Sequence, residues 1–204
     1  VTIIGVILST AMITGVISLV VSFQNFLLED EIANEGRWHI KSSDQSSAEI
    51  EEAVNDASVK EVNPIYGLGY ADFESLNSDK PYLYIASIDN FESELTPRVI
   101  ITEGRLPENS TEIIIPSHLS LYVENTYAIG DQLDLEIGYR EIPGEENEYL
   151  GQDVRFTHTM DDSEESIVNK ETRSFTVVGF YERAEVEPFT APVFTLLTTE
   201  AVMD

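Results

Sequence analysis

Cysteine and basic residues are what this sequence most lacks. None of its 204 residues is cysteine, which excludes disulfide bonds, a thiolate nucleophile and a zinc site with cysteine ligands. Its 11 Lys and Arg residues face 38 Asp and Glu residues, giving a net charge of −27. Such an excess repels nucleic-acid phosphate and anionic lipid headgroups. Its simplest role is to keep an exposed domain soluble; attraction of cationic partners, such as basic peptides or divalent ions, is the alternative.

Charged residues and histidine are also absent from the run Val1–Leu28. About 20 apolar residues cross a hydrocarbon core of about 30 Å as a helix, so this run is long enough to span a membrane. It lacks the basic start, short apolar core and small-residue cleavage site of a signal peptide. We therefore expect a transmembrane helix over residues 1–28, continuing as a stalk to about residue 35, within a fragment of a longer protein.

The flank of this span carries acidic residues before any basic one. Glu29, Asp30 and Glu31 precede Arg37, the first basic residue. Because cytoplasmic flanks are enriched in Lys and Arg, we expect a cell-membrane protein with the chain extracytoplasmic from about residue 29 onward. Small residues in the span would let another helix pack closely, although a lone helix tolerates them equally. They are Gly5, Ser9, Thr14, Gly15 and Ser18.

The first part of the soluble region reads as strand, helix, strand, strand. Gly36 is expected to end the stalk, and residues 37–41 resemble a short strand. Ser46 and Glu49 form a capping box, which predicts a helix beginning there. Its apolar stripe is typical of a helix docked on a sheet. The stripe consists of Ile50, Ala53, Val54 and Ala57, and extended segments follow at 59–62, 66–73 and 81–89.

The later part is mostly β. Strands are expected at residues 99–102, 112–115, 132–138, 174–180 and 192–197. Residues 133–137 alternate apolar and acidic side chains, as in a strand with one buried face. Between residues 142 and 172 the chain is polar, which we interpret as a long hairpin loop or a mobile insertion. The fold class is therefore α+β, with no internal repeat.

Residues that could carry chemistry are scattered. His39, His118 and His158 have no second ligand nearby in sequence, so surface or strand roles are the better interpretation. The run Asp161–Glu165 resembles a solvated charge run more than a calcium loop, and metal binding in the acidic loop 145–165 stays open. Asn109–Thr111 has the form of a glycosylation acceptor in a turn.

Aromatic residues gather in the expected early strands, where they could line a ligand groove but fit strand packing better. They are Tyr66, Tyr70, Phe73, Tyr82 and Tyr84. The sequence has no G-x-S-x-G, Walker phosphate loop or H-E-x-x-H motif. We therefore expect no catalytic, cofactor or metal site, and no enzyme activity in this chain.

Several stretches together resemble a known family. They are TIIGVILSTAMITGVISL, EGRWHI, EGRLPENSTEIIIP, YAIGDQLDLEIG and FTVVGFYER. In this order behind a first span, they resemble the FtsX-like permeases of ABC transporters, in the branch with a MacB-like extracytoplasmic core domain after the first helix. The residues that carry the resemblance are turn and strand signals with an expected structural role. They are Gly104, Arg105, Pro107, Glu112, Gly130, Asp131 and Gly179.

The resemblance implies a two-lobed domain over residues 36–204. An α+β sandwich lobe would comprise about 37–102 and 191–204, and an inserted β-rich lobe about 103–190. It also implies a separate cytoplasmic ABC ATPase, a second permease copy, and transmission of ATPase-driven motion for substrate export or extraction or for partner activation. A cationic peptide, which the acidic surface favours, and a lipid-linked molecule are the candidate substrates. The sequence fixes neither the substrate nor the choice between homodimer and heterodimer. The rival interpretation is a ligand-binding sensor domain of a signalling receptor; the acidic surface fits no nucleic acid.

Overall fold

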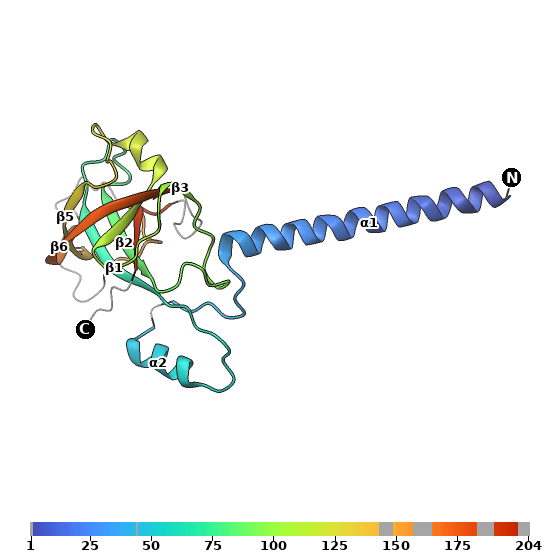
Figure 1. Ribbon diagram of the computed structural model, residues 1–204, viewed down its shortest axis with the longest axis horizontal. Helices are drawn as coiled ribbons and strands as arrows, with labels where there is room; N and C mark the ends of the chain where they lie inside the picture. The colour runs from blue at the N-terminus through green and yellow to red at the C-terminus, as the bar shows by residue number, and fades with distance from the viewer. Residues whose placement is uncertain (1, 44, 143–148, 157–164, 183–189, 200–204) are drawn as a thin grey trace.

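The computed structural model describes residues 2–43, 45–142, 149–156, 165–182 and 190–199. A single long helix projects from a β-rich body, and one short helix lies beside that body (Figure 1). The helices are α1 (Thr2–Glu35), α2 (Ser47–Asn55) and the 3₁₀ helix η1 (Ser117–Tyr122). The strands are β1 (Ile65–Asp72), β2 (Tyr82–Ile88), β3 (Ile101–Gly104), β4 (Glu112–Pro116), β5 (Gln132–Glu141), β6 (Ser166–Tyr181) and β7 (Val193–Thr198).

Helix α1 confirms the expected apolar span. Residues Ile3–Ala33 form one helix that is long and apolar enough to cross a membrane, and its apolar side chains are exposed all round. Two of its hydroxyl groups are satisfied within the helix, since Ser9 donates to the Gly5 carbonyl and Thr10 to the Val6 carbonyl. Such internal bonding suits a polar side chain in hydrocarbon, where water cannot replace it. The helix runs on as expected to Glu35.

The seven strands form one sheet that closes on itself. Their order is β3-β6-β4-β7-β2-β1-β5, and β5 also pairs with β6, so six strands make a barrel-like ring to which β3 is added. Strands β2–β7 and β4–β6 pair in parallel, and the other pairs are antiparallel. The strands of both expected lobes lie in this one sheet, and the expected lobe boundaries near residues 102 and 190 mark no break in it. The coarse α+β description holds.

The barrel interior is filled by every second residue of its strands. In β5 the alternation seen in the sequence places Leu133, Leu135 and Ile137 inside. Phe175 of β6 and Phe194 of β7 are almost fully buried beside them. Close packing of these side chains is what holds the ring together. The apolar interior leaves the acidic positions of the same strands on the outside.

A second apolar cluster covers the outer face of β2, β4, β6 and β7. Ile88, Ile114 and Leu197 are buried there beneath the segment that runs from the end of β2 into β3. Phe91 and Val99 of this covering segment pack against the cluster. The connection between β2 and β3 is therefore part of the body of the domain.

The expected docking of a helix on the sheet is wrong. Helix α2 forms with its capping box at Ser46 and Glu49, as predicted. However, Val54 is 60% exposed, and α2 lies below the sheet rather than on it (Figure 1). The apolar outer face of β2, β4, β6 and β7 is covered instead by the segment after β2.

Three other local expectations are corrected. Residues 37–41 and 59–62 form no strand; the Arg37 amide donates to the Glu94 carbonyl, and the Val59 amide donates to the Asp56 carbonyl in a turn. Strand β6 begins at Ser166, so the polar stretch after residue 142 is shorter than expected. Its polar residues pair by backbone with β5 and point outward, which explains why the sequence looked like a loop.

Candidate functional site: the junction between the helix and the domain

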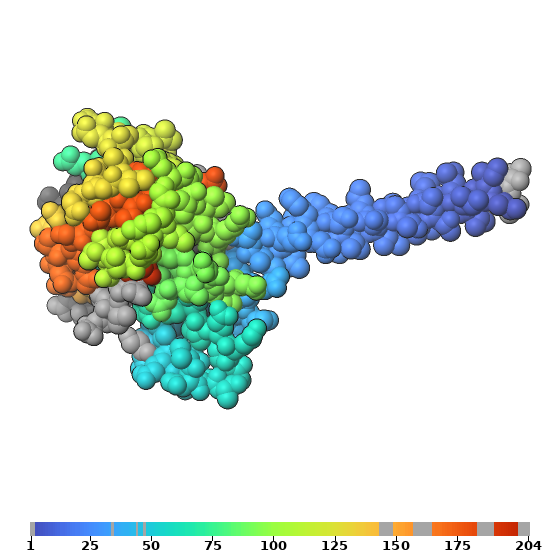
Figure 2. Space-filling view, in the orientation of Figure 1, coloured from blue at the N-terminus to red at the C-terminus, as the bar shows by residue number. Residues whose placement is uncertain are grey.

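The last turn of α1 is bonded directly to the domain. The Arg37 amide donates to the Glu94 carbonyl at 2.6 Å, and the Arg98 amide donates to the Ala33 carbonyl at 3.1 Å. In the first bond the helix side is the donor, and in the second it is the acceptor, so the two bonds join α1 to the segment after β2. Figure 2 shows the end of α1 seated against the body of the domain. The helix is therefore anchored by backbone groups whose geometry depends little on side-chain identity.

Gly36 makes this close approach possible. Its φ is +93°, a left-handed conformation typical of the residue that ends a helix, and its amide donates to the Ile32 carbonyl at 2.9 Å. A Cβ at this position would overlap the Leu95 carbonyl. Only glycine meets both the backbone angle and the contact. The helix end predicted at Gly36 from sequence is confirmed.

The segment that receives α1 is itself held by a polar network. Thr96, 6% exposed, donates its hydroxyl to the Asn90 carbonyl at 2.8 Å and accepts from the Asn63 side-chain amide. Ser93 donates to Glu61 at 2.8 Å. These bonds fix the turns that present the Glu94 carbonyl and the Arg98 amide to α1.

Side chains just beyond the helix add a clasp. Trp38 Nε1 donates to the Glu35 carbonyl at 3.0 Å, and Lys41 Nζ lies 3.0 Å from the Glu35 carboxylate. The Lys41 ammonium also lies 5.9 Å from the centre of the Trp38 ring. The clasp folds the chain back over the last turn of α1.

A shallow cavity, called here the junction cavity, opens between α1 and the segment after β2. It has a volume of about 330 Å³. Apolar side chains line one part of it and charged groups the rest. The lining residues are Ile32, Arg37, Phe91, Glu92, Ser93, Glu94, Thr96, Arg98 and Val99.

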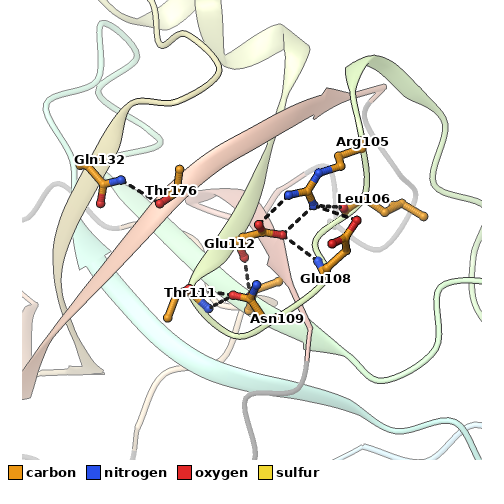
Figure 3. Close-up of polar contacts among 9 residues, drawn as sticks. Arg105, Leu106, Glu108, Asn109, Thr111, Glu112, Gln132 and Thr176 are labelled. Carbon is orange, nitrogen blue, oxygen red and sulfur yellow. Dashed lines mark hydrogen bonds and ion pairs between the residues drawn. The ribbon is translucent and has the colours of Figure 1, made fainter.

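The residues that carry the family resemblance do not line the junction cavity and lie mainly along β6. Arg105 makes a bidentate ion pair with Glu112, with Nη1 and Nη2 at 2.7 and 2.6 Å from the two carboxylate oxygens (Figure 3). Glu112 also accepts from the Glu108 amide at 2.9 Å. The Arg105 hydrogen bond is the main reason that the pKa of Glu112 is lowered to about 2. Pro107 is buried in the loop that this pair closes.

The four remaining motif residues shape the turns beside β6. Gly104 has φ +78°, and a Cβ there would overlap the Val178 carbonyl; a Cβ on Gly179 would lie 2.6 Å from the Arg105 carbonyl. The Gly130 amide donates to Val177, whose amide donates to the Asp131 carbonyl. The geometry brings six of the seven to β6, with Pro107 in the loop that precedes β4, and none of the seven lines the junction cavity.

A buried ion pair is the feature that the sequence did not reveal. Arg140, whose side chain is 0% exposed, lies 2.9 Å from Glu165, whose side chain is 4% exposed. Arg140 also donates to the carbonyls of Gly151 and Val154. Glu165 ends the acidic run that looked solvated, so that interpretation is wrong for this residue; residues 161–164 lie outside the described part. The two residues are 25 positions apart, so no local sequence pattern predicts that they pair.

The other residues considered from sequence take structural positions. His39 is exposed, the His118 ring lies 5.6 Å from that of Phe194, and His158 lies outside the described residues. The early aromatic residues pack in the strands, with the Tyr70 and Tyr84 rings 4.9 Å apart. Within the described ranges, no group of three His, Asp or Glu side chains could hold a metal ion.

Comparison with known proteins gives no relative from which a function could be transferred. No protein-family model, curated protein or solved structure matches this chain.

Proposed function

We propose that this chain is the first membrane helix and extracytoplasmic domain of an ABC transporter permease of the FtsX-like family, with a MacB-like core domain. The observation that carries the proposal is the continuous helix α1, which runs from its apolar span into backbone hydrogen bonds with the domain. A helix joined in this way is mechanically coupled to the domain, and its angle to the barrel can change at the junction. It would transmit motion driven by a separate cytoplasmic ATPase to the outside of the membrane.

The arrangement of the motif residues supports the family assignment. The residues that carry the resemblance meet around β6, as expected of turn signals that belong to one fold. The family's division into an α+β lobe and an inserted β-rich lobe stays a prediction for this chain. So do a second permease copy and a cationic peptide or lipid-linked substrate.

Purification of the protein from its native membrane in mild detergent tests the assignment. We expect an ATPase with a phosphate-binding loop to accompany it in stoichiometric amount. A histidine kinase or another signalling partner without an ATPase would instead make this chain a sensor domain, which is the rival function.

Cysteine labelling tests the orientation, because the chain has no cysteine of its own. We expect Ser78→Cys, on an exposed turn, to react in whole cells with a maleimide that cannot cross membranes. Ser18→Cys, in the middle of the apolar span, is the matched control and should react poorly. Labelling of Ser78→Cys only after the cells are opened would contradict an extracytoplasmic domain.

A further inference from the structure

The junction cavity lies at the depth of lipid headgroups if α1 crosses the membrane. The apolar run ends at Leu28, and Ile32 in the cavity wall lies four residues further along the helix. At about 1.5 Å per residue, this places Ile32 about 6 Å beyond the hydrocarbon edge. The headgroup layer adds about 5–8 Å to each side of the hydrocarbon core. The cavity therefore opens where phosphate and ammonium groups of the outer leaflet are found.

The cavity carries both signs of charge in a strongly acidic protein. Arg37 and Arg98 line it together with Glu92 and Glu94. The single ion pair between them, from Arg37 to Glu94, is 3.8 Å long, and its side chains are 62% and 78% exposed, so it constrains them weakly. Among the described residues, no carboxylate pairs with the Arg98 guanidinium. Both arginines are thus available to a bound group.

The remaining wall is apolar, and the volume is small. Ile32, Phe91 and Val99 present hydrocarbon surface beside the charged groups. A volume of about 330 Å³ is at the lower end of the range for small-molecule sites, about 300–1,000 Å³. This suits a headgroup and its glycerol carbons and is too small for the acyl chains.

We infer that the junction cavity binds the zwitterionic headgroup of an outer-leaflet phospholipid. Arg37 and Arg98 hold the phosphate, since guanidinium groups bind phosphate through paired hydrogen bonds. Glu92 and Glu94 face the ammonium group. A purely anionic headgroup is disfavoured, because the net charge of −27 and the negative end of the α1 dipole both oppose it.

A lipid bound in the junction cavity would contact both α1 and the domain. Its headgroup contacts α1 through Ile32 and the domain through Phe91, so binding would stabilise one angle between the two. The inference rests on the proposed membrane crossing of α1 but not on the permease assignment.

Fluorescence of Trp38 offers a direct binding test. It is the only tryptophan, is 40% exposed and follows Arg37 in the chain. The full chain in maltoside detergent would be titrated with glycerophosphoethanolamine, and separately with glycerophosphate and with ethanolamine. We expect a saturable change in fluorescence with the zwitterion, and much weaker changes with glycerophosphate, which is only anionic, and with ethanolamine, which is only cationic. An equal response to glycerophosphate, or none to the zwitterion, would overturn the inference.

Charge-neutralising variants locate the response. Arg98→Gln and Glu94→Gln should each weaken binding about tenfold, the loss expected for one charged hydrogen bond. Arg173→Gln on β6 removes the same charge at a residue that does not line the cavity and should bind as the parent does. Thermal unfolding of each variant verifies its fold. Unchanged binding by folded Arg98→Gln and Glu94→Gln would place the response elsewhere and overturn the site.

A lipid experiment distinguishes a membrane ligand from a free headgroup. The chain would be recovered from vesicles of equal phosphatidylethanolamine and phosphatidylglycerol, and the lipid retained would be identified by native mass spectrometry. We expect retained phosphatidylethanolamine, depleted in Arg98→Gln and present in Arg173→Gln. Retention of phosphatidylglycerol instead would contradict the zwitterionic assignment. Neither result depends on whether an ATPase accompanies the protein.

Discussion

The barrel and the junction are held together by different forces. The barrel buries apolar side chains from six strands, and residues such as Ile85, Ile113 and Phe194 are almost fully enclosed. The junction relies on a few backbone hydrogen bonds, a network of hydroxyl and amide groups and a small, open cavity. Burial of apolar area gives the larger and more cooperative stabilisation.

This difference suggests a division of roles. Regions with little apolar burial and exposed backbone hydrogen bonds open at lower free-energy cost than a core does. The barrel is therefore expected to behave as one rigid body, and the junction as the place where its angle to α1 changes. Four predictions test the contrast, from the largest expected effect to the smallest.

Loss of one partner of the buried ion pair should damage the barrel most. Arg140→Met leaves Glu165 buried without its counter-charge, and such losses cost about 3–5 kcal/mol. Denaturant unfolding of the full chain in detergent would measure the change. Arg173→Met, which removes an arginine from a pair with an exposed carboxylate, should cost less than about 1 kcal/mol.

The double variant Arg140→Met with Glu165→Leu sharpens this result. Removing both charges should recover much of the loss, because an apolar pair of similar volume is often tolerated in place of a buried ion pair. A double variant as unstable as Arg140→Met would show that the hydrogen bonds of Arg140 to the Gly151 and Val154 carbonyls, rather than its ion pair, account for its contribution to stability.

Glycine substitutions separate close packing from backbone strain. Gly104 and Gly130 both have positive φ, but a Cβ would overlap the Val178 carbonyl at Gly104 and meet nothing within 4 Å at Gly130. Gly130→Ala should therefore cost about 1–2 kcal/mol of unfolding free energy from the left-handed angle alone. Gly104→Ala should cost more, by an amount read from the same unfolding curves. Equal costs would mean that β6 yields easily at this contact.

These positions also show what sequence can and cannot reveal. The long apolar run, the Ser46 capping box and the alternation in residues 133–137 are local patterns, and each predicted its element correctly. The closure of β5 onto β6 and the pairing of Arg140 with Glu165 depend on residues far apart in the chain, for which no local pattern exists. The docking of α2 on the sheet was wrongly predicted for a related reason: the apolar stripe of a helix does not reveal that another segment, the one after β2, covers the apolar outer face of the sheet.

The junction was only half predictable on the same grounds. Gly36 ends the helix by a local rule that the sequence displays. The hydrogen bonds of Arg37 and Arg98 to partners in another segment, and the cavity between them, arise only when α1 meets the turns after β2. Residues 37–41 resembled a strand because their apolar and polar side chains alternate, yet the Arg37 amide bonds to the Glu94 carbonyl in the junction.

Gly36→Ala should affect the junction without affecting the barrel. The added Cβ would overlap the Leu95 carbonyl, so the bonds around it should weaken. We expect faster hydrogen exchange at the amides of Arg37 and Arg98, measured by mass spectrometry of the matching peptides. The barrel's unfolding free energy should change by no more than about 0.5 kcal/mol, as for a surface substitution.

Gly130→Ala is the matched control for this variant. It introduces alanine at a positive φ on the barrel side, and should leave exchange at the junction unchanged. If Gly36→Ala instead lowered barrel stability as much as Gly104→Ala, the helix end and the barrel would form one cooperative unit. The proposed adjustable joint would then be excluded.

The smallest expected effect concerns acid and the pair of Arg105 with Glu112. The hydrogen bond from Arg105 lowers the pKa of Glu112 from 4.5 to about 2, so the folded protein favours the ionised carboxylate. The stabilisation is fully present above pH 4.5 and is lost as the pH falls through about 2. Glu112→Gln removes this titration, so the difference in unfolding free energy between parent and variant should shrink as the pH falls across that window.

Salt should also weaken the contribution of this pair. Since half of the Arg105 side chain is in solvent, the effect is screened by salt and should fall at high ionic strength. A difference that stays constant from pH 5 to pH 2 would show that the pair braces the β3–β4 turn through its shape rather than its charge.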